Sequence, residues 1–167
     1  MKKLLLSLLF TITAILLWNC EKDDICEDGT PTTPRMIIEF YDNNNPTTKK
    51  TVTNLAVVAQ NVTDTLLFNG VSKIEIPLKT NAENVIFNFV HDSKNATVSL
   101  RNTDEVIANY TRNDVFISRA CGYKTVFTLN DSNGLDFTPD SDNWIKEIAI
   151  QNQNILNENE VHVKIFF

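Results

Sequence analysis

From residue 35 onward, apolar and polar residues alternate along the chain with a period close to two. This period is typical of half-buried strands, because successive side chains of a strand point to opposite faces of a sheet. The alternating segments lie at residues 35–40, 73–78, 85–91, 96–102, 106–110, 115–117 and 161–167. Their richness in Val, Ile, Phe, Thr and Tyr also favours strands.

The first and last of these segments predict most clearly which side chains face the core. The residues expected on the buried face are Met36, Ile38, Phe40, Val161, Val163 and Ile165. The residues expected on the opposite, wet face are Arg35, Ile37, Glu39, His162 and Lys164. Both strands are therefore predicted to have one side in the core and the other in water.

Polar clusters rich in asparagine separate the alternating segments. The chain has only four glycines, and Asn can replace Gly in turns because it tolerates left-handed backbone and bonds its own main chain. The predicted turns lie at residues 42–46, 69–70, 92–95, 113–114 and 131–134. About nine strands, with turns roughly every eight to twelve residues, indicate an all-β fold. We expect an antiparallel, Ig-like β-sandwich, with a closed β-barrel as the alternative.

Residues 143–153 fit both a helical and a strand period, since Trp144 and Ile148 share a face in either arrangement. A polar loop at 152–159 joins this segment to the alternating run at 160–167. We therefore expect a strand here, paired with residues 160–167.

The N-terminal residues have the pattern of a secretory signal. Two lysines precede an apolar stretch at 4–18. That stretch is about fifteen residues long, whereas a membrane-spanning helix needs roughly eighteen or more. Residues 17–20, Leu-Trp-Asn-Cys, resemble the lipobox of bacterial lipoproteins, in which the cysteine receives a diacylglycerol. Asn19 departs from the small residue that is usual before this cysteine. We expect a signal peptide at 1–19 and lipid on Cys20.

The remainder is predicted to form a tether at 20–33 and a single β domain at 34–167. The net charge of the chain is −6, and loss of Lys2 and Lys3 with the signal would make it −8. A chain this acidic has no basic stripe to bind nucleic acid. Its attachment to a membrane is therefore expected to depend on the lipid of Cys20.

The three cysteines of the chain are accounted for by this assignment. With Cys20 lipidated, Cys26 and Cys121 remain as a pair in a compartment where disulfides persist. We expect them to be bonded; the alternative is two separate buried thiols. A bond would hold the domain near the membrane, because the six steps from Cys20 to Cys26 extend over about 20 Å at most.

Charged residues directly follow the lipidated cysteine. Lys22, Asp23 and Asp24 are similar to the surface-export signal of Bacteroidota lipoproteins. We expect an outer-membrane protein at the cell surface rather than on the periplasmic side. The alternative interpretation of these residues is a solvated linker.

No catalytic pattern stands out in the sequence. The two histidines, His91 and His162, are expected at the surface, and the chain has no G-x-S-x-G, H-E-x-x-H or Gly-rich phosphate loop. We expect no enzymatic activity, no cofactor and no metal site. Trp144 and Tyr123 are candidates for a platform that stacks sugar rings, although core packing would also explain them.

Several stretches together resemble a family of uncharacterised Bacteroidota lipoproteins, a domain of unknown function. They are residues 20–26, TPRMIIEFYD at 33–42, NLAVV at 54–58, IEIPL at 74–78, YTRNDVFISRACGYKT at 110–125 and HVKIFF at 162–167. The resemblance implies a secreted, lipid-anchored β domain with Cys26 and Cys121 at matched positions. It implies no activity.

These observations predict a lipid-anchored outer-membrane lipoprotein without catalytic function. We expect it to be a binding or structural accessory of an envelope complex, with a membrane-bound protein as its partner. The alternative is a glycan-binding module on the cell surface, which requires an exposed aromatic face around Trp144.

Overall fold

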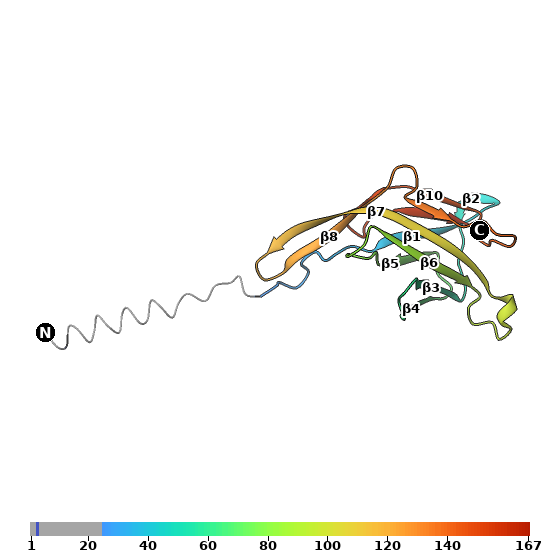
Figure 1. Cartoon of the computed structure of the whole chain (residues 1–167), viewed down its shortest axis with the longest axis horizontal. Helices are drawn as coiled ribbons and strands as arrows, with labels where there is room; N and C mark the ends of the chain where they lie inside the picture. The colour runs from blue at the N-terminus through green and yellow to red at the C-terminus, as the bar shows by residue number, and fades with distance from the viewer. Residues whose placement is uncertain (1–2, 4–24) are drawn as a thin grey trace. The chain divides into compact units, whose positions relative to one another are not determined.

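The computed structural model describes residues 3 and 25–167 (Figure 1). The chain divides into two compact units. The tip unit comprises the described residues up to Thr30 together with Phe116–Tyr123, and the sandwich unit comprises Pro31–Val115 and Lys124–Phe167. The described residues form twelve strands in two sheets, most of them antiparallel neighbours. The all-β prediction is thus confirmed, with more strands than the nine expected.

The first sheet has five strands. In spatial order they are β10 (Glu147–Ile150), β12 (Val163–Phe166), β1 (Met36–Asp42) and β2 (Asn45–Lys49), with β5 (Lys73–Ile76) also paired with β1. Strands β1 and β12 run parallel, and the other pairs are antiparallel. The predicted pairing of the segment after Trp144 with the C-terminal run is confirmed, because Ile148 of β10 lies opposite Ile165 of β12.

The second sheet has seven strands. In spatial order they are β11 (Asn154–Ile155), β8 (Gly122–Leu129), β7 (Asn102–Ser118), β6 (Asn84–His91), β3 (Leu55–Ala59) and β4 (Thr65–Phe68), with β9 (Leu135–Phe137) also paired with β7. A short 3-10 helix at Val98–Leu100 precedes β7. Neither of these sheets closes on itself, so the barrel alternative is wrong and the sandwich is correct.

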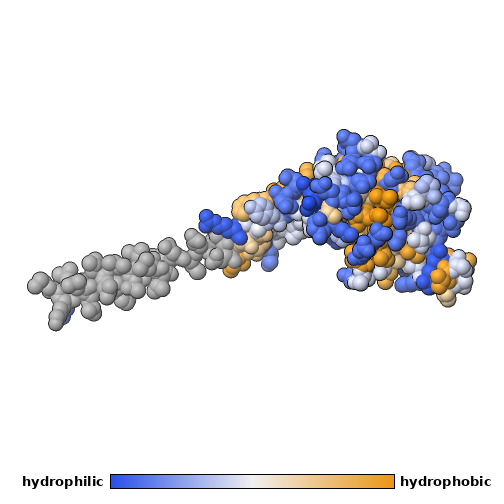
Figure 2. All heavy atoms as spheres, viewed as in Figure 1, coloured by the Kyte–Doolittle hydropathy of each residue, from blue (hydrophilic) through white to orange (hydrophobic). Residues whose placement is uncertain are grey.

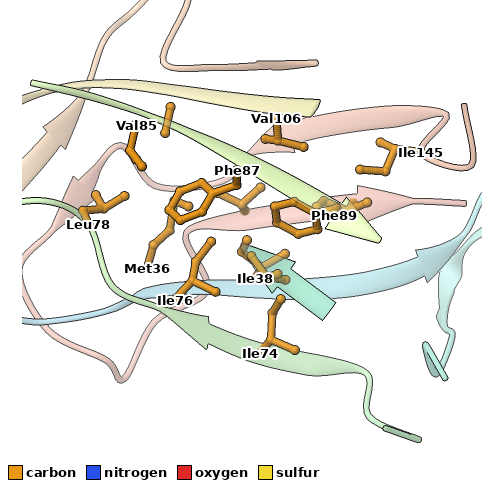
Figure 3. Packing of buried hydrophobic residues seen from close by; sticks show 14 of the residues in the cluster. Met36, Ile38, Ile74, Ile76, Leu78, Val85, Phe87, Phe89, Val106 and Ile145 are labelled. Atoms are coloured by element: carbon orange, nitrogen blue, oxygen red, sulfur yellow. The ribbon is translucent and has the colours of Figure 1, made fainter. Parts of the chain in front are cut away.

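Alternating side chains of the two sheets share one hydrophobic core in the sandwich unit. The first sheet contributes Ile38 and Ile74, and the second contributes Phe87, Phe89 and Val106 (Figure 3). Phe87 and Phe89 come from alternate positions of β6, and each of these five side chains is at most 2% exposed. The period of two in the sequence therefore identified the core faces of these strands correctly.

The outer face of β1 is more buried than the alternation predicts. Ile37, Glu39 and His162 were expected in water, yet they are 1%, 7% and 1% exposed. These residues have close partners there: the Glu39 carboxylate accepts hydrogen bonds from the Tyr41 hydroxyl and the Lys49 ammonium, and the His162 ring accepts one from the Ile37 backbone N–H. A central strand is apolar at consecutive positions when both of its faces are covered.

Strand β7 continues through the predicted turn at residues 113–114. It runs without interruption from Asn102 to Ser118, and the chain reverses only after Ser118. The Thr125 hydroxyl donates a hydrogen bond of 2.7 Å to Oδ1 of Asp114, so the side chain expected to form a turn contacts a residue of β8 instead. Pairing between strands here overrides the local turn preference of Asn-Asp.

Candidate functional site

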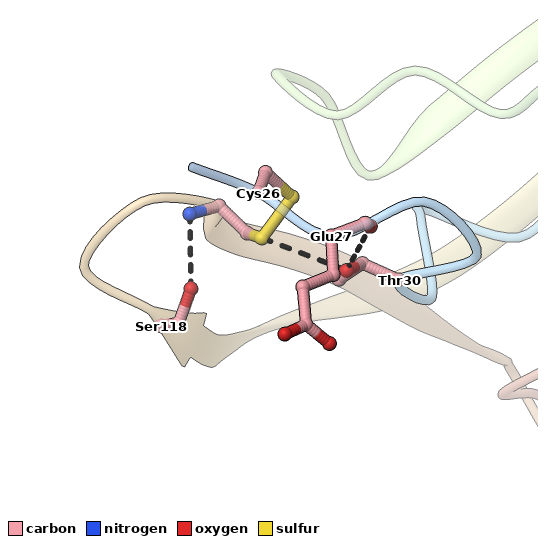
Figure 4. The surroundings of a disulfide bond; sticks show 5 residues. Cys26, Glu27, Thr30 and Ser118 are labelled. Atoms are coloured by element: carbon pink, nitrogen blue, oxygen red, sulfur yellow. Dashed lines mark hydrogen bonds between the residues drawn. A yellow bond between two sulfur atoms is a disulfide. The ribbon is translucent and has the colours of Figure 1, made fainter. Parts of the chain in front are cut away.

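The tip unit is held together by a disulfide. Cys26 and Cys121 are bonded, with their Cα atoms 4.9 Å apart, which confirms the predicted pair (Figure 4). Cys121 lies in the turn between β7 and β8, where its backbone N–H donates 3.0 Å to the Ser118 hydroxyl. Gly122 follows with φ of +70°, a left-handed conformation that glycine adopts without steric cost. The described end of the N-terminal segment is thus fastened to the turn of the hairpin.

Large apolar side chains are exposed around this disulfide. Ile25, Phe116 and Tyr123, which we call the tip patch, are 79%, 56% and 69% exposed. The rings of Phe116 and Tyr123 lie 5.3 Å apart, edge to face. Figure 2 shows hydrophobic surface at this end of the β7–β8 hairpin. Soluble domains usually bury such side chains together, so a cluster of them on a hairpin indicates a contact surface.

A hollow of about 260 Å³ lies on the tip unit beside the tip patch. Ile25, Ile117 and Cys121 line it with Glu27 and Thr30. The Thr30 hydroxyl donates 2.6 Å to the carbonyl of Glu27, which closes the turn that forms one wall. The hollow is therefore lined by the disulfide and two isoleucines and has one carboxylate at its side.

The two residues of the predicted sugar platform differ in exposure, since Trp144 is buried and Tyr123 is 69% exposed. Trp144 is only 8% exposed, and its indole N–H donates 3.0 Å to the carbonyl of Phe89. Phe167 packs edge-to-face against the indole at 5.4 Å. The alternative explanation, core packing, is the correct one for Trp144, whereas Tyr123 belongs to the tip patch.

A second candidate surface lies at an edge of the sandwich unit. A groove of about 250 Å³, which we call the edge groove, opens beside β4. Its apolar lining consists mainly of Val57, Ala59, Leu66, Leu78, Val85 and Phe87. Four of these (Val57, Leu78, Val85 and Phe87) belong to the buried core cluster. The edge groove is therefore bounded in part by side chains of the core.

One wall of the edge groove is the segment that follows β5, from Pro77 to Lys79. The Tyr110 hydroxyl holds this segment in place, since it accepts from the Lys79 backbone N–H and donates to the Lys79 carbonyl, each at 3.0 Å. Burial raises the pKa of the Tyr110 hydroxyl, so it keeps its proton and remains a donor. This wall is thus positioned by a buried side chain from β7.

Strand β4 forms the opposite wall and the end of its sheet. Among the strands that the structure describes, β4 is paired with β3 alone. Its side chains alternate: Leu66 and Phe68 pack against the core, while Leu67 is 64% exposed on the outer face. The adjacent pair Leu66-Leu67 is a sequence signal for this surface that the alternation pattern did not reveal, because it places apolar side chains on both faces of one strand.

Charged groups stand at the edge groove without forming a catalytic arrangement. Asp64 and Lys79 line it, and the Lys79 ammonium donates 3.1 Å to the carbonyl of Gln60. A carboxylate and an ammonium beside an apolar groove can orient a peptide or an amphipathic ligand. The groove therefore has the chemistry of a binding surface.

Among the buried polar side chains that the sequence did not identify, His162 and Asp104 are the least exposed. His162 accepts a hydrogen bond of 2.9 Å from the Ile37 backbone N–H at its Nδ1, so the neutral ring carries its proton on Nε2. Burial lowers the pKa of His162, while Glu160 acts in the opposite direction. Asp104 is fully buried, and its Oδ2 accepts 2.7 Å from the Ile145 backbone N–H. Burial raises the pKa of the Asp104 carboxyl. Both residues bind backbone groups and thus have structural roles.

Neither metal-binding clusters nor membrane-spanning helices are found in the described part of the chain. Within residues 3 and 25–167, no three His, Cys, Asp or Glu side chains are grouped as metal ligands would be. Within the same residues, no helix has the length and apolar character needed to cross a bilayer. The predicted lipid site Cys20 and the predicted export residues Lys22, Asp23 and Asp24 lie outside the described residues.

Comparison with protein families matches residues 41–167 to a family of unknown function (DUF6452). The match covers both core sheets from the end of β1 to the C-terminus. No curated protein is significantly similar to the chain. No solved structure is significantly similar to it either.

Proposed function

The chain belongs to the DUF6452 family, and we propose that it is a lipid-anchored outer-membrane lipoprotein that binds a protein partner without catalysis. The observation that carries the proposed binding role is the edge groove beside the open strand β4. The partner is an extended segment of another envelope protein. The family resemblance to Bacteroidota lipoproteins seen in the sequence agrees with this location.

The proposed lipid anchor rests on the N-terminal sequence and is supported by the disulfide. A bond between Cys26 and Cys121 leaves Cys20 as the remaining cysteine of the three, which is the residue that a lipoprotein acylates. The disulfide also suits a protein exported to an oxidising compartment. Lys22, Asp23 and Asp24 favour display at the cell surface. Two or three acyl chains would give stable attachment.

The proposed partner binds by adding a strand to the second sheet. An edge strand offers unpaired backbone N–H and C=O groups, and an extended segment can pair with them. Alternate side chains of that segment would point to the same side as Leu66 and could enter the edge groove. Asp64 and Lys79 at the edge groove would then interact with charged or polar side chains of the segment and so fix the direction in which it runs. Affinity would come from the backbone pairing, and preference for one partner from the groove.

Site-specific photo-crosslinking in intact cells tests the binding role. A photoreactive amino acid replaces Leu67, which is exposed on β4, and in a matched variant it replaces Val98, which is 69% exposed outside the sheet. We expect a discrete crosslinked band with the probe at Leu67 and none with the probe at Val98. The second variant shows that exposure of a probe is insufficient by itself.

Filling the edge groove should abolish the crosslink. Ala59→Trp places an indole in the groove, and Ala96→Trp, at an exposed position away from it, is the matched control. We expect loss of the Leu67 crosslink in Ala59→Trp alone, with folding of both variants checked by circular dichroism. A crosslink that survives in folded Ala59→Trp would show that the groove is not the binding site. Equal labelling at Leu67 and Val98 would contradict a specific partner.

A further inference from the structure

The tip of the β7–β8 hairpin has apolar side chains on both of its faces. Phe116 and Ile117 are consecutive residues of β7, so their side chains point to opposite sides of the strand. Phe116 contacts Tyr123 on one side, whereas Ile117 lines the hollow with Ile25 on the other. The disulfide lies beside this hollow. A molecule that buries all of these side chains must therefore contact both faces of the hairpin.

We infer that the tip patch is a second membrane contact of the protein, which inserts into the interface of a phospholipid bilayer beside the acyl chains of Cys20. This inference rests on the proposed lipid anchor and extends it: the bilayer is recognised by a folded part of the chain as well as by the lipid. A lipid interface can surround a hairpin from both sides. A flat protein surface could cover only one of its faces.

The length of the tether brings the tip within reach of the bilayer. The described segment begins at Ile25, and only five residues separate Cys20 from Cys26 in the sequence. Fully extended, this stretch covers about 20 Å. Because Cys26 is bonded to Cys121, the same limit applies to the turn of the hairpin. An anchored protein therefore keeps its tip patch close to the headgroups, whatever the tether conformation.

The composition of the tip suits the interface of a bilayer. Tyrosine is enriched where membranes meet water, because its ring is apolar and its hydroxyl is polar. Arg119 is the one charged residue within Phe116–Tyr123, and a long arginine side chain can keep its charge in the headgroup layer. Glu27 and Asp28 are exposed on the neighbouring segment, which disfavours an anionic surface. The lipid expected at the tip is thus zwitterionic.

Fluorescence quenching by brominated lipids tests this contact on the whole lipoprotein. Tyr123→Trp places a tip reporter in the tip patch, and Leu156→Trp places a control reporter at a 49% exposed position in the sandwich unit. The acylated proteins are reconstituted into phosphatidylcholine vesicles with or without bromine on the acyl chains. Unsubstituted protein supplies the signal of Trp144, the one tryptophan in residues 20–167, for subtraction. We expect a blue shift and loss of emission for the tip reporter, and neither change for the control reporter.

The outcomes separate this inference from the proposed anchor. Mass spectrometry of the purified protein first establishes whether Cys20 carries lipid; an unmodified Cys20 would overturn the anchor and the membrane contact together. Full emission of the tip reporter in an acylated protein would overturn the membrane contact alone. The same result, combined with protection of the tip reporter from quenchers in whole envelopes, would assign the tip patch to a protein partner instead. Equal quenching of the two reporters would indicate non-specific adsorption and would also overturn it.

Discussion

The two units of this protein differ in how they are stabilised. In the sandwich unit, large side chains such as Phe89 are completely buried in a core shared by two sheets. In the tip unit, Phe116 and Tyr123 are more than half exposed, and a disulfide joins residues 95 positions apart. The end of a two-stranded hairpin is too small to form a core, so a covalent bond is suited to stabilise it.

This difference bears on the role of the exposed apolar residues in the tip unit. Apolar side chains that contribute to a core cannot be removed without loss of stability. The tip patch is free of that constraint, because the disulfide holds the hairpin end whether or not Phe116 and Tyr123 are covered. Their exposure is therefore available for a contact with another molecule, and the comparison can be tested by changing each unit separately.

The largest effect is expected from removing the disulfide. The double variant Cys26→Ser, Cys121→Ser releases a closed loop of 95 residues in the unfolded chain. The entropy of that loop predicts a decrease of about 4–5 kcal/mol in the free energy of unfolding. Urea denaturation followed by circular dichroism measures it. Wild-type protein in a reducing agent is the control and should match the variant. Unchanged denaturation in both would show that the bond does not stabilise the fold.

The next effect distinguishes buried from exposed aromatic residues. Phe89→Ala creates a cavity in the core and is expected to lower the free energy of unfolding by about 3–5 kcal/mol. The same substitution at the tip, Phe116→Ala, should change it by no more than about 0.5 kcal/mol. Thermal and urea denaturation of the two variants provide the measurement. A large loss in Phe116→Ala would mean that the tip patch is part of the folding core.

The smallest effect concerns the buried imidazole of His162. Its lowered pKa means that the native ring resists a proton that the unfolded chain accepts, so stability falls as the pH drops below about 6.5. Protonation of Nδ1 would also remove the hydrogen bond from the Ile37 N–H. We expect His162→Gln to weaken this pH dependence between about pH 7.5 and 5.5. His91→Gln is the matched control and should retain it. Identical profiles for wild type and His162→Gln would show that His162 does not contribute.

The alternation of residues predicted the core faces of most strands and the strand at the end of the chain. Ile38, Phe87 and Phe89 were placed correctly, because a period of two leaves little freedom once one face must be buried. Arithmetic on three cysteines likewise indicated the pair Cys26 and Cys121. The core faces depend on residues that are neighbours in sequence, and the cysteine pair depends on the number of cysteines. Both can be obtained from the sequence.

Other features depend on residues that meet only in the folded chain. His162 alternates like a surface residue but is buried, and its Nδ1 accepts a hydrogen bond from the backbone N–H of Ile37 in β1. Asn113-Asp114 has the composition of a turn but continues β7, since Asp114 meets Thr125 across the hairpin. Trp144 could equally have stacked sugars or filled the core, and only the contacts with Phe89 and Phe167 decided between them.

The sequence by itself therefore determined the class of fold, the core faces of most strands and the cysteine pair, because the period is a local property of the chain and the cysteines can be counted. The tertiary structure decided which edge stays open, which polar groups are buried and which apolar residues remain in water. Leu66 and Phe116 are equally apolar in sequence, yet one lines the edge groove and the other belongs to the tip patch. Their difference arises from the strands that lie beside them, and those are set only when the sheets assemble.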